Sequence, residues 1–188
     1  MNNKFNLSFL IIFFLIVACS GKEEKVSVLK EKNLETQMIE VYSEAMAEFE
    51  RGDVIYAGKK FSEAELLFPQ SIWAPRALLM SAYGYFSQGY YKDAINDLER
   101  FIFKYKNHPQ TDYAYYLLAL CHYDQIIDEK KDFNEILEAK KYFEIVINDF
   151  PDTDYASDSK YKLELIIEIS ASKEMYLARY YVEREKWI

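Results

Sequence analysis

Apolar residues recur along most of the chain with the three- and four-residue spacing of amphipathic helices. The same series occurs three times: an alanine, a large apolar residue four positions later, and another apolar residue three positions after that. The copies are Ala57-Phe61-Ala64, Ala94-Leu98-Phe101 and Ala139-Phe143-Val146. This pattern predicts helix pairs at about residues 35–51 with 54–68, 75–87 with 91–106, and 112–124 with 135–149. A fourth striped helix is expected over residues 154–170, with Leu163, Ile166, Ile167 and Ser170 on one side. Ala178 and Tyr181 then fit a new first helix.

A proline-centred motif separates these helix pairs. It reads Pro69-Gln-Ser-Ile-Trp-Ala74, Pro109-Gln-Thr-Asp-Tyr-Ala114 and Pro151-Asp-Thr-Asp-Tyr-Ala156, with prolines 40 and 42 positions apart. Proline cannot continue a helix, so each copy is expected to end the helix before it. The hydroxyls of Ser71, Thr111 and Thr153 are expected to cap the helix that follows. A period of this length predicts stacked helical units.

The small–large–small spacing resembles the second helix of a tetratricopeptide repeat. The preceding helices supply Ala45, Ala82 and Ala119 for close packing, and Gly52 and Gly89 are expected in the turns. We therefore predict an all-α fold, a tetratricopeptide-like solenoid of helix-turn-helix units over residues 35–188. The last unit is incomplete, which predicts a fragment of a longer protein or a chain completed by a partner.

Composition agrees with a helical protein and narrows the choice of partners. Among 188 residues there are 5 Gly and 4 Pro, against 17 Tyr and 13 Phe. A net charge of −8 argues against nucleic acid as a ligand and against electrostatic docking on anionic lipids.

The N-terminus is expected to be a secretory signal and a lipid anchor. Lys4 precedes an apolar run over residues 7–18, which is too short to span a membrane. The sequence Ile16-Val17-Ala18-Cys19 resembles the lipobox of bacterial lipoproteins. That resemblance implies a signal peptide at 1–18, a lipidated Cys19, and residues 19–34 as a flexible tether. Ser20, by the same resemblance, favours the outer membrane. The alternative is an ordinary signal peptide that contains a cysteine.

No catalytic constellation, metal motif or cofactor motif is found, so an enzyme is not expected. His122 occupies a helix face, where a packed or half-exposed imidazole is expected. Cys121, which has no disulfide partner once Cys19 is lipidated, is expected in the core.

Binding is then the expected activity. In this repeat type the first helices line a concave groove, here with Leu79, Tyr83, Phe86, Tyr116, Leu120 and Tyr123. Such rings suit aromatic or apolar peptide ends. The alternative, packing between helices, stays open for these six residues. Packing inward is favoured for Tyr42, Met46 and Phe49, because Glu44 and Glu48 take the usual core positions of that helix.

Several stretches resemble the BamD family of outer-membrane lipoproteins. They are Leu98-Glu-Arg-Phe-Ile102, Asn107-His-Pro109 with Asp112-Tyr113, His122-Tyr-Asp-Gln-Ile126, and Met175 through Trp187. The resemblance implies a non-catalytic subunit of the β-barrel assembly machinery, on the periplasmic face of the outer membrane. It further implies binding to BamA, to other subunits of the machine and to carboxy-terminal segments of unfolded outer-membrane proteins. The alternative is another periplasmic repeat lipoprotein that holds peptidoglycan-linked complexes together.

Overall fold

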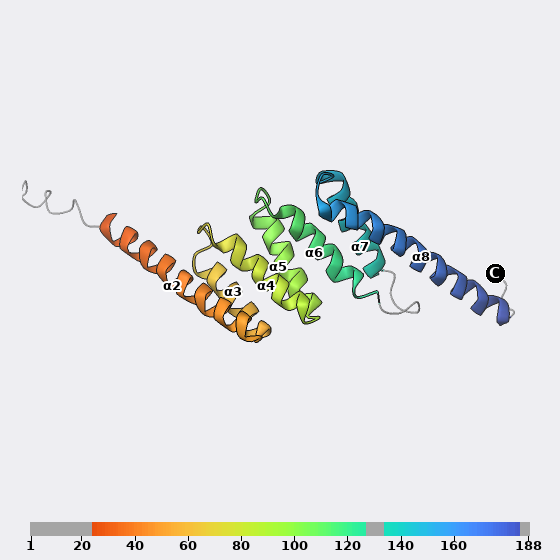
Figure 1. Cartoon of the computed structure of the whole chain (residues 1–188), viewed down its shortest axis with the longest axis horizontal. Helices are drawn as coiled ribbons and strands as arrows, with labels where there is room; N and C mark the ends of the chain where they lie inside the picture. Colours follow the sequence, from red (N-terminus) through yellow and green to blue (C-terminus); the bar gives the residue numbers. More distant parts are fainter. Residues whose placement is uncertain (1–23, 127–133, 185–188) are drawn as a thin grey trace, which may run out of the picture.

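The computed structural model describes residues 24–126 and 134–184, in which every regular element is an α-helix (Figure 1). The helices are α2 (Glu24–Arg51), α3 (Val54–Leu67), α4 (Ala74–Ser87), α5 (Tyr91–Lys104), α6 (Thr111–Tyr123), α7 (Asn134–Asp149) and α8 (Asp154–Glu183). The three predicted helix pairs are confirmed, with boundaries that differ by one or two residues except at the start of α2. The all-α prediction is confirmed as well.

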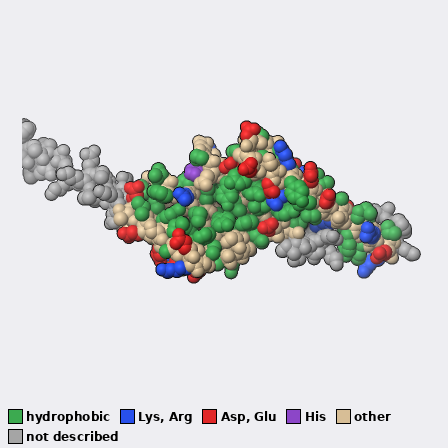
Figure 2. Space-filling model, viewed as in Figure 1, with side chains coloured by type: hydrophobic (Ala, Val, Ile, Leu, Met, Phe, Trp, Pro, Cys, Tyr) green, Lys and Arg blue, Asp and Glu red, His purple; other side chains and the backbone are tan. Residues whose placement is uncertain are grey.

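The helices stack in sequence order along the long axis of the molecule. Each helix packs on the one before it, and the first helices α4, α6 and α8 also contact one another in turn. In Figure 1 the helices α2, α4, α6 and α8 run in the same oblique direction, with α2 at one end and α8 at the other. This is the predicted solenoid. Figure 2 shows hydrophobic side chains gathered over the middle of the visible face, with charged side chains mostly around its rim.

The repeated apolar series forms the core of each unit. All nine of its residues are fully buried, as are Ala45, Ala82 and Ala119 on the facing first helices. Alanine at these positions lets two helix backbones approach while a phenylalanine of the neighbouring helix fills the remaining space. The predicted packing positions are therefore confirmed.

Glycine closes two of the turns within helix pairs. Gly52 and Gly89 have φ values of 91° and 75°, a left-handed conformation that costs glycine little. The Gly89 amide donates to the Phe86 carbonyl at 2.9 Å, which satisfies one of the free carbonyls at the end of α4. The turn role predicted for both glycines is confirmed.

The three proline motifs end helices as predicted, but their hydroxyls act differently. The Thr153 side chain accepts from the Ala156 amide and caps α8. Ser71 accepts instead from the Trp73 amide, just before α4 begins. Thr111 is already inside α6, and its hydroxyl donates to the His108 carbonyl at 2.7 Å. The capping prediction is thus confirmed for Thr153, whereas the Thr111 hydroxyl stabilises the loop that precedes α6.

The C-terminal half of the chain departs from the predicted pattern in α8. We expected a helix at 154–170 and then a new one, but α8 is a single helix of 30 residues. No proline or glycine interrupts this stretch, so nothing in it stops the helix. Ile166 is 2% exposed while Ile167 is 65% exposed, because neighbouring helix positions point about 100° apart. The shared face predicted for these two residues was wrong.

At the other end α2 begins at Glu24 and so includes part of the segment expected as a tether. The predicted signal peptide and Cys19 lie outside the described residues, as do residues 127–133 of the long turn expected before α7 and the chain end after residue 184.

A buried polar cluster ties the first repeat to the second. The Glu65 carboxylate on α3 is fully buried and accepts from Lys104 Nζ at 3.0 Å and from the Tyr105 hydroxyl at 2.9 Å. Arg100 Nε lies 3.6 Å from the other Glu65 oxygen, and Arg100 also pairs with Asp97 at 3.0 Å. Since α3 and α5 are both second helices, the cluster fixes the spacing of adjacent units.

Candidate functional site

A hollow of about 550 Å³ opens between the three successive first helices α2, α4 and α6. It is lined by Phe49, Arg76, Leu79, Met80, Tyr83, Gln110 and Tyr113. Phe49 comes from α2, the next four residues from α4, Gln110 from the position just before α6, and Tyr113 from the first turn of α6. Because only first helices and the joint before α6 contribute, this hollow lies where the repeat pattern predicts the concave groove. We call it the groove pocket.

Aromatic rings dominate the groove pocket. The Phe49 and Tyr83 ring centroids are 6.2 Å apart with an interplanar angle of 40°, and Tyr83 is 40% exposed. On the far side, Tyr113 packs on Tyr155 with centroids 5.5 Å apart. Burial raises the pKa of the Tyr113 hydroxyl to about 12. The pocket therefore combines aromatic residues from three successive first helices.

The aromatic surface continues toward the start of α4. A smaller hollow of about 270 Å³ is lined by Met38, Ile39, Tyr42, Ser43 and Trp73. The Tyr42 and Trp73 rings are 5.9 Å apart, and the Arg76 guanidinium lies 5.9 Å from the Trp73 ring centroid. Arg76 thus stands between the two hollows, since it also lines the groove pocket. Together they form an aromatic path along α2 and α4.

Of the six predicted groove residues, the structure brings Leu79 and Tyr83 into the groove pocket. Leu79 is only 4% exposed, so it forms part of the floor, whereas Tyr83 stands in the opening. Phe86 packs on the core beside Tyr91, with centroids 6.1 Å apart. Leu120 is partly buried between two core clusters. For Phe86 and Leu120, packing between helices is what the structure shows.

The remaining two predicted residues face the next helix. The Tyr116 ring stacks on Tyr155 with centroids 5.0 Å apart, and its hydroxyl donates to Asp158 at 2.6 Å. Tyr123 packs against Phe143 at 6.0 Å, with the Lys162 ammonium 5.1 Å from its ring centroid. Both side chains are therefore engaged by α7 and α8 rather than lining the groove pocket.

Sequence reasoning missed five residues of the groove pocket. They are Phe49, Arg76, Met80, Gln110 and Tyr113. Tyr113 could have been found, because it is the aromatic residue of the proline motif. Phe49 was expected to pack inward, and it does pack on the buried Phe61 ring, with centroids 6.5 Å apart, while it also lines the pocket. Arg76 looks like an ordinary helix-surface residue, and Gln110 belongs to the proline motif, where it was not considered as a groove residue.

His122 and Cys121 behave as predicted. The imidazole is 9% exposed, stacks on Tyr142 and lies with Nδ1 2.7 Å from a Glu135 oxygen. The Cys121 thiol is fully buried, and burial raises its pKa to about 12, so it is a poor nucleophile. Both side chains join α6 to its neighbours and face no cavity described above.

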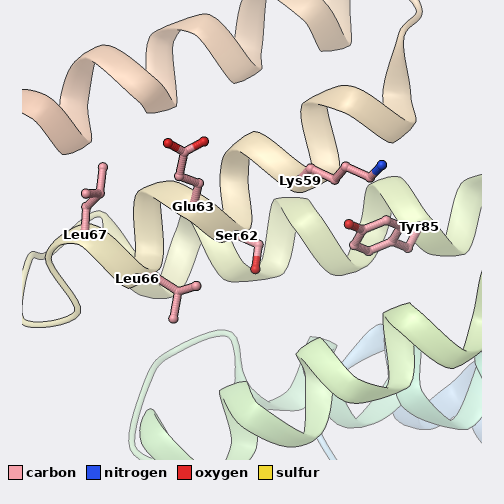
Figure 3. A pocket seen from close by; sticks show the side chains of 6 residues that line it. All are labelled: Lys59, Ser62, Glu63, Leu66, Leu67 and Tyr85. Carbon is pink, nitrogen blue, oxygen red and sulfur yellow. The ribbon is translucent and has the colours of Figure 1, made fainter.

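A third hollow, of about 400 Å³, runs along α3 and is closed on one side by Tyr85 of α4 (Figure 3). Its other lining residues are Lys59, Ser62, Glu63, Leu66 and Leu67. Leu66 is 58% exposed, and the lining carries one charge of each sign. It contains none of the predicted groove residues and few ring faces, so we place the candidate site in the groove pocket.

Within residues 24–126 and 134–184, no group of three or more metal-ligating side chains comes together. Among the helices of this described part, none combines the length and apolar character needed to cross a membrane.

Residues 34–188 match the family model described as "YfiO: Outer membrane lipoprotein". The chain is also similar to proteins named outer membrane protein assembly factor BamD. The relative from Caulobacter vibrioides is 32% identical over 89% of this chain and 54% of its own length. The relative from Rickettsia prowazekii is 30% identical over 94% of this chain and 68% of its own length. The relative from Xylella fastidiosa is 26% identical over 97% of this chain and 64% of its own length. The chain thus spans about half to two thirds of the length of these relatives.

Proposed function

The chain belongs to the YfiO/BamD family of outer membrane lipoproteins, and from this membership we propose that it is a non-catalytic outer membrane protein assembly factor. In this role it binds segments of unfolded outer-membrane proteins and works with partner subunits, BamA among them. Cys19 is its lipid anchor in the inner leaflet of the outer membrane, which leaves the repeats in the periplasm. The names of the relatives support the assembly role.

One observation carries the substrate-binding part of this proposal: the groove pocket collects three aromatic rings from three successive repeats. Phe49, Tyr83 and Tyr113 line one hollow of about 550 Å³, a size typical of ligand sites. Rings that are already fixed by core packing lose little conformational entropy when they bind, so they suit a shallow peptide site. Among the residues predicted from sequence, Leu79 and Tyr83 are those we retain as groove residues.

The expected ligand is an extended peptide that carries aromatic side chains. Segments of outer-membrane β-strands alternate apolar and polar residues, and aromatic residues gather at their ends. Such a segment can place alternate side chains along the path from Trp73 to Tyr83 while its polar residues face water.

We predict that Tyr83→Ala weakens peptide binding by about five- to thirtyfold, because a stacked ring at a binding site contributes about 1–2 kcal/mol. The measurement is fluorescence anisotropy of a labelled peptide ending in aromatic-x-aromatic, titrated with the full chain in detergent. Tyr161→Ala is the matched control, since Tyr161 is 59% exposed on α8 and lines none of the hollows described above. Equal binding of the peptide and its scrambled version, or equal loss in both variants, would contradict the groove assignment.

A further inference from the structure

The two junctions between successive helix pairs are built from different chemistry. We call the contact of α2–α3 with α4–α5 the first junction and the contact of α4–α5 with α6–α7 the second junction. The three copies of the apolar series show which residues occupy equivalent positions in the two junctions. Four of these positions are polar or charged in the first junction and hydrophobic or aromatic in the second. The pairs of equivalent residues are Glu65 and Ile102, Ser81 and Leu118, Asp97 and Tyr142, and Arg100 and Ile145.

The contacts of the first junction are directional. Arg100 reaches from α5 to α3, where its guanidinium donates to the Ser62 hydroxyl at 2.9 Å and lies 3.6 Å from the Glu65 carboxylate. The same guanidinium pairs with Asp97 at 3.0 Å, which holds it in one orientation. Glu65 is fully buried, and its other two contacts also come from α5 and the residue that follows it. Ion pairs and hydrogen bonds of this kind require a narrow range of distance and angle.

The second junction is held by buried apolar surface instead. Leu118 is a buried member of the core cluster around Leu98, and Ile102 and Tyr142 pack against that cluster. Apolar contacts have no preferred angle, so neighbouring helices can rotate slightly while the same side chains stay buried. The first junction therefore fixes an orientation, whereas the second fixes mainly a distance.

The first junction also contains a point about which the helices can turn. A Cβ atom added to Gly84 of α4 would lie 3.3 Å from the Val54 carbonyl oxygen and 3.7 Å from Gly58 Cα of α3, so the two backbones meet here. No side chains interlock at a contact between two glycines, and rotation about it is therefore resisted by the surrounding contacts. One of these is Ser81, whose hydroxyl lies 2.8 Å from the Gly58 carbonyl and 2.5 Å from the Asp97 carboxylate.

We propose that Glu65 and Arg100 are positioning residues, which fix the angle of the first helix pair on the second and so set the width of the groove pocket. The pocket spans the first junction, because Phe49 belongs to the first pair whereas Arg76 and Tyr83 belong to the second. Since α2 packs on α3, Phe49 moves with Glu65 when the first pair turns on the second. Contacts between the second helices thus determine the separation of Phe49 and Tyr83, whose ring centroids are 6.2 Å apart. The part of this inference that concerns ligands rests on the proposed function.

The second junction supplies the replacement that tests this proposal. Glu65→Ile, Arg100→Ile and Asp97→Asn, combined in one triple variant, give the first junction the apolar character of the second. Replacing a buried ion-pair network by apolar residues often leaves stability unchanged or raises it, so the triple variant is expected to fold. The amide at position 97 keeps a hydrogen-bond partner for the Ser81 hydroxyl.

The measurement is the distance between two spin labels, obtained by pulsed electron paramagnetic resonance on the full chain in detergent. Cys19 is replaced by serine, and Cys121 is buried and stays unlabelled. One label pair, Glu50→Cys with Asn96→Cys, joins α2 to α5 across the first junction. The other, Asn96→Cys with Lys140→Cys, joins α5 to α7 across the second, and all three labelled sites are exposed. We expect one narrow distance for each pair in wild type, and loss of the narrow maximum for the α2–α5 pair alone in the triple variant.

Glu65→Gln is a milder variant, which keeps the shape of the side chain but removes its charge, and it is expected to broaden the α2–α5 distance less. Glu99→Gln is the matched control, because Glu99 is exposed on α5, and it is expected to leave both distances unchanged. Thermal unfolding shows whether each variant is folded. Peptide affinity in the anisotropy titration is expected to fall about two- to tenfold in the triple variant, the effect of having to order one flexible group on binding.

A narrow α2–α5 distance in the folded triple variant, or in Glu65→Gln if the triple variant does not fold, would overturn the proposal. Equal broadening of both label pairs would also overturn it, since the cluster would then hold the whole solenoid together rather than orient its first pair. If the distances respond as expected while peptide affinity stays unchanged, the orientation is confirmed and its link to the groove pocket is wrong. If wild type binds no peptide above its scrambled control, the proposed function fails, whereas the distances still decide the orientation.

Discussion

Asp97 shows how far one residue can depart from what its place in the sequence suggests. As a charged residue in the amphipathic helix α5 it would be expected at the surface. Its side chain is nevertheless only 6% exposed and faces α4. Its carboxylate is 2.5 Å from the Ser81 hydroxyl, and the Gly58 carbonyl lies 2.8 Å from the same hydroxyl. A hydroxyl has one proton to donate, so Ser81 donates either to the Asp97 carboxylate or to the Gly58 carbonyl. Burial raises the pKa of Asp97, although Ser81 and Arg100 oppose the change.

A raised carboxyl pKa has a definite effect on stability. The folded state binds the proton more tightly than the unfolded state, so the contribution of Asp97 is largest below the usual carboxyl pKa of 3.8. It declines as pH rises through the higher folded value. We predict that the difference in unfolding free energy between wild type and Asp97→Asn is greatest near pH 4 and shrinks toward pH 7, measured by urea denaturation.

Asp93→Asn is the control for this pH dependence, because Asp93 lies on the same helix and is exposed. The other carboxylates titrate alike in wild type and variant and cancel in the difference. A difference in unfolding free energy that stays constant from pH 4 to pH 7 would contradict the prediction.

At the scale of the elements, the packing of α8 on α6 determines which side chains of the third repeat remain exposed. Its first half covers α6, where Tyr155 stacks on Tyr116 and Asp158 accepts from the Tyr116 hydroxyl. Burial raises the pKa of Tyr116, and the hydrogen bond to Asp158 raises it further. The ring that the repeat pattern placed in the groove is therefore a structural contact between two first helices. The groove pocket ends at Tyr113, one turn earlier on α6.

We predict that Tyr116→Phe lowers the unfolding free energy by about 1 kcal/mol, the usual contribution of a partly exposed hydrogen bond to a charged group. Peptide affinity in the anisotropy titration is expected to stay unchanged. Tyr115→Phe is the neighbouring control, since within the described residues the Tyr115 hydroxyl forms no hydrogen bond while its ring packs on Tyr142 and Phe150. Weaker peptide binding with unchanged stability in Tyr116→Phe would instead support the groove role predicted from sequence.

At the scale of the whole molecule, stability is expected to vary along the solenoid. Each unit packs mainly on its neighbours, so helices in the middle bury two faces and helices at the ends bury one. The cluster around Leu98 and Phe101 joins α4, α5 and α6. In contrast, the side chains from Ala171 to Arg184 are exposed, apart from Lys173.

We therefore predict slow amide hydrogen exchange in α4 to α6 and exchange at least about tenfold faster in the distal half of α8, since helices without tertiary packing open easily. Exchange followed by mass spectrometry on the full chain tests this, with α7 as an internal reference because it packs on both α6 and α8. Protection over residues 172–183 equal to that of α6 would contradict it.

The sequence by itself determined the helices, their pairing and the positions of the core. Periodicity depends on local geometry, because alanine and phenylalanine three and four residues apart must share one helix face whatever packs on it. Proline and glycine likewise act through their own backbone, which is why the turns at Gly52 and Gly89 and the ends of α3, α5 and α7 were predicted correctly.

Only the tertiary structure decided which aromatic residues face the groove and which face a neighbouring helix. Tyr83 and Tyr116 were both predicted to line the groove from successive first helices, yet Tyr83 is 40% exposed while Tyr116 is covered by α8. It also placed Arg76 beside Trp73 and buried Glu65 against Arg100 and Lys104 from 35 to 39 residues away. Contacts of this range depend on how successive units are rotated against each other, and no local spacing encodes that rotation.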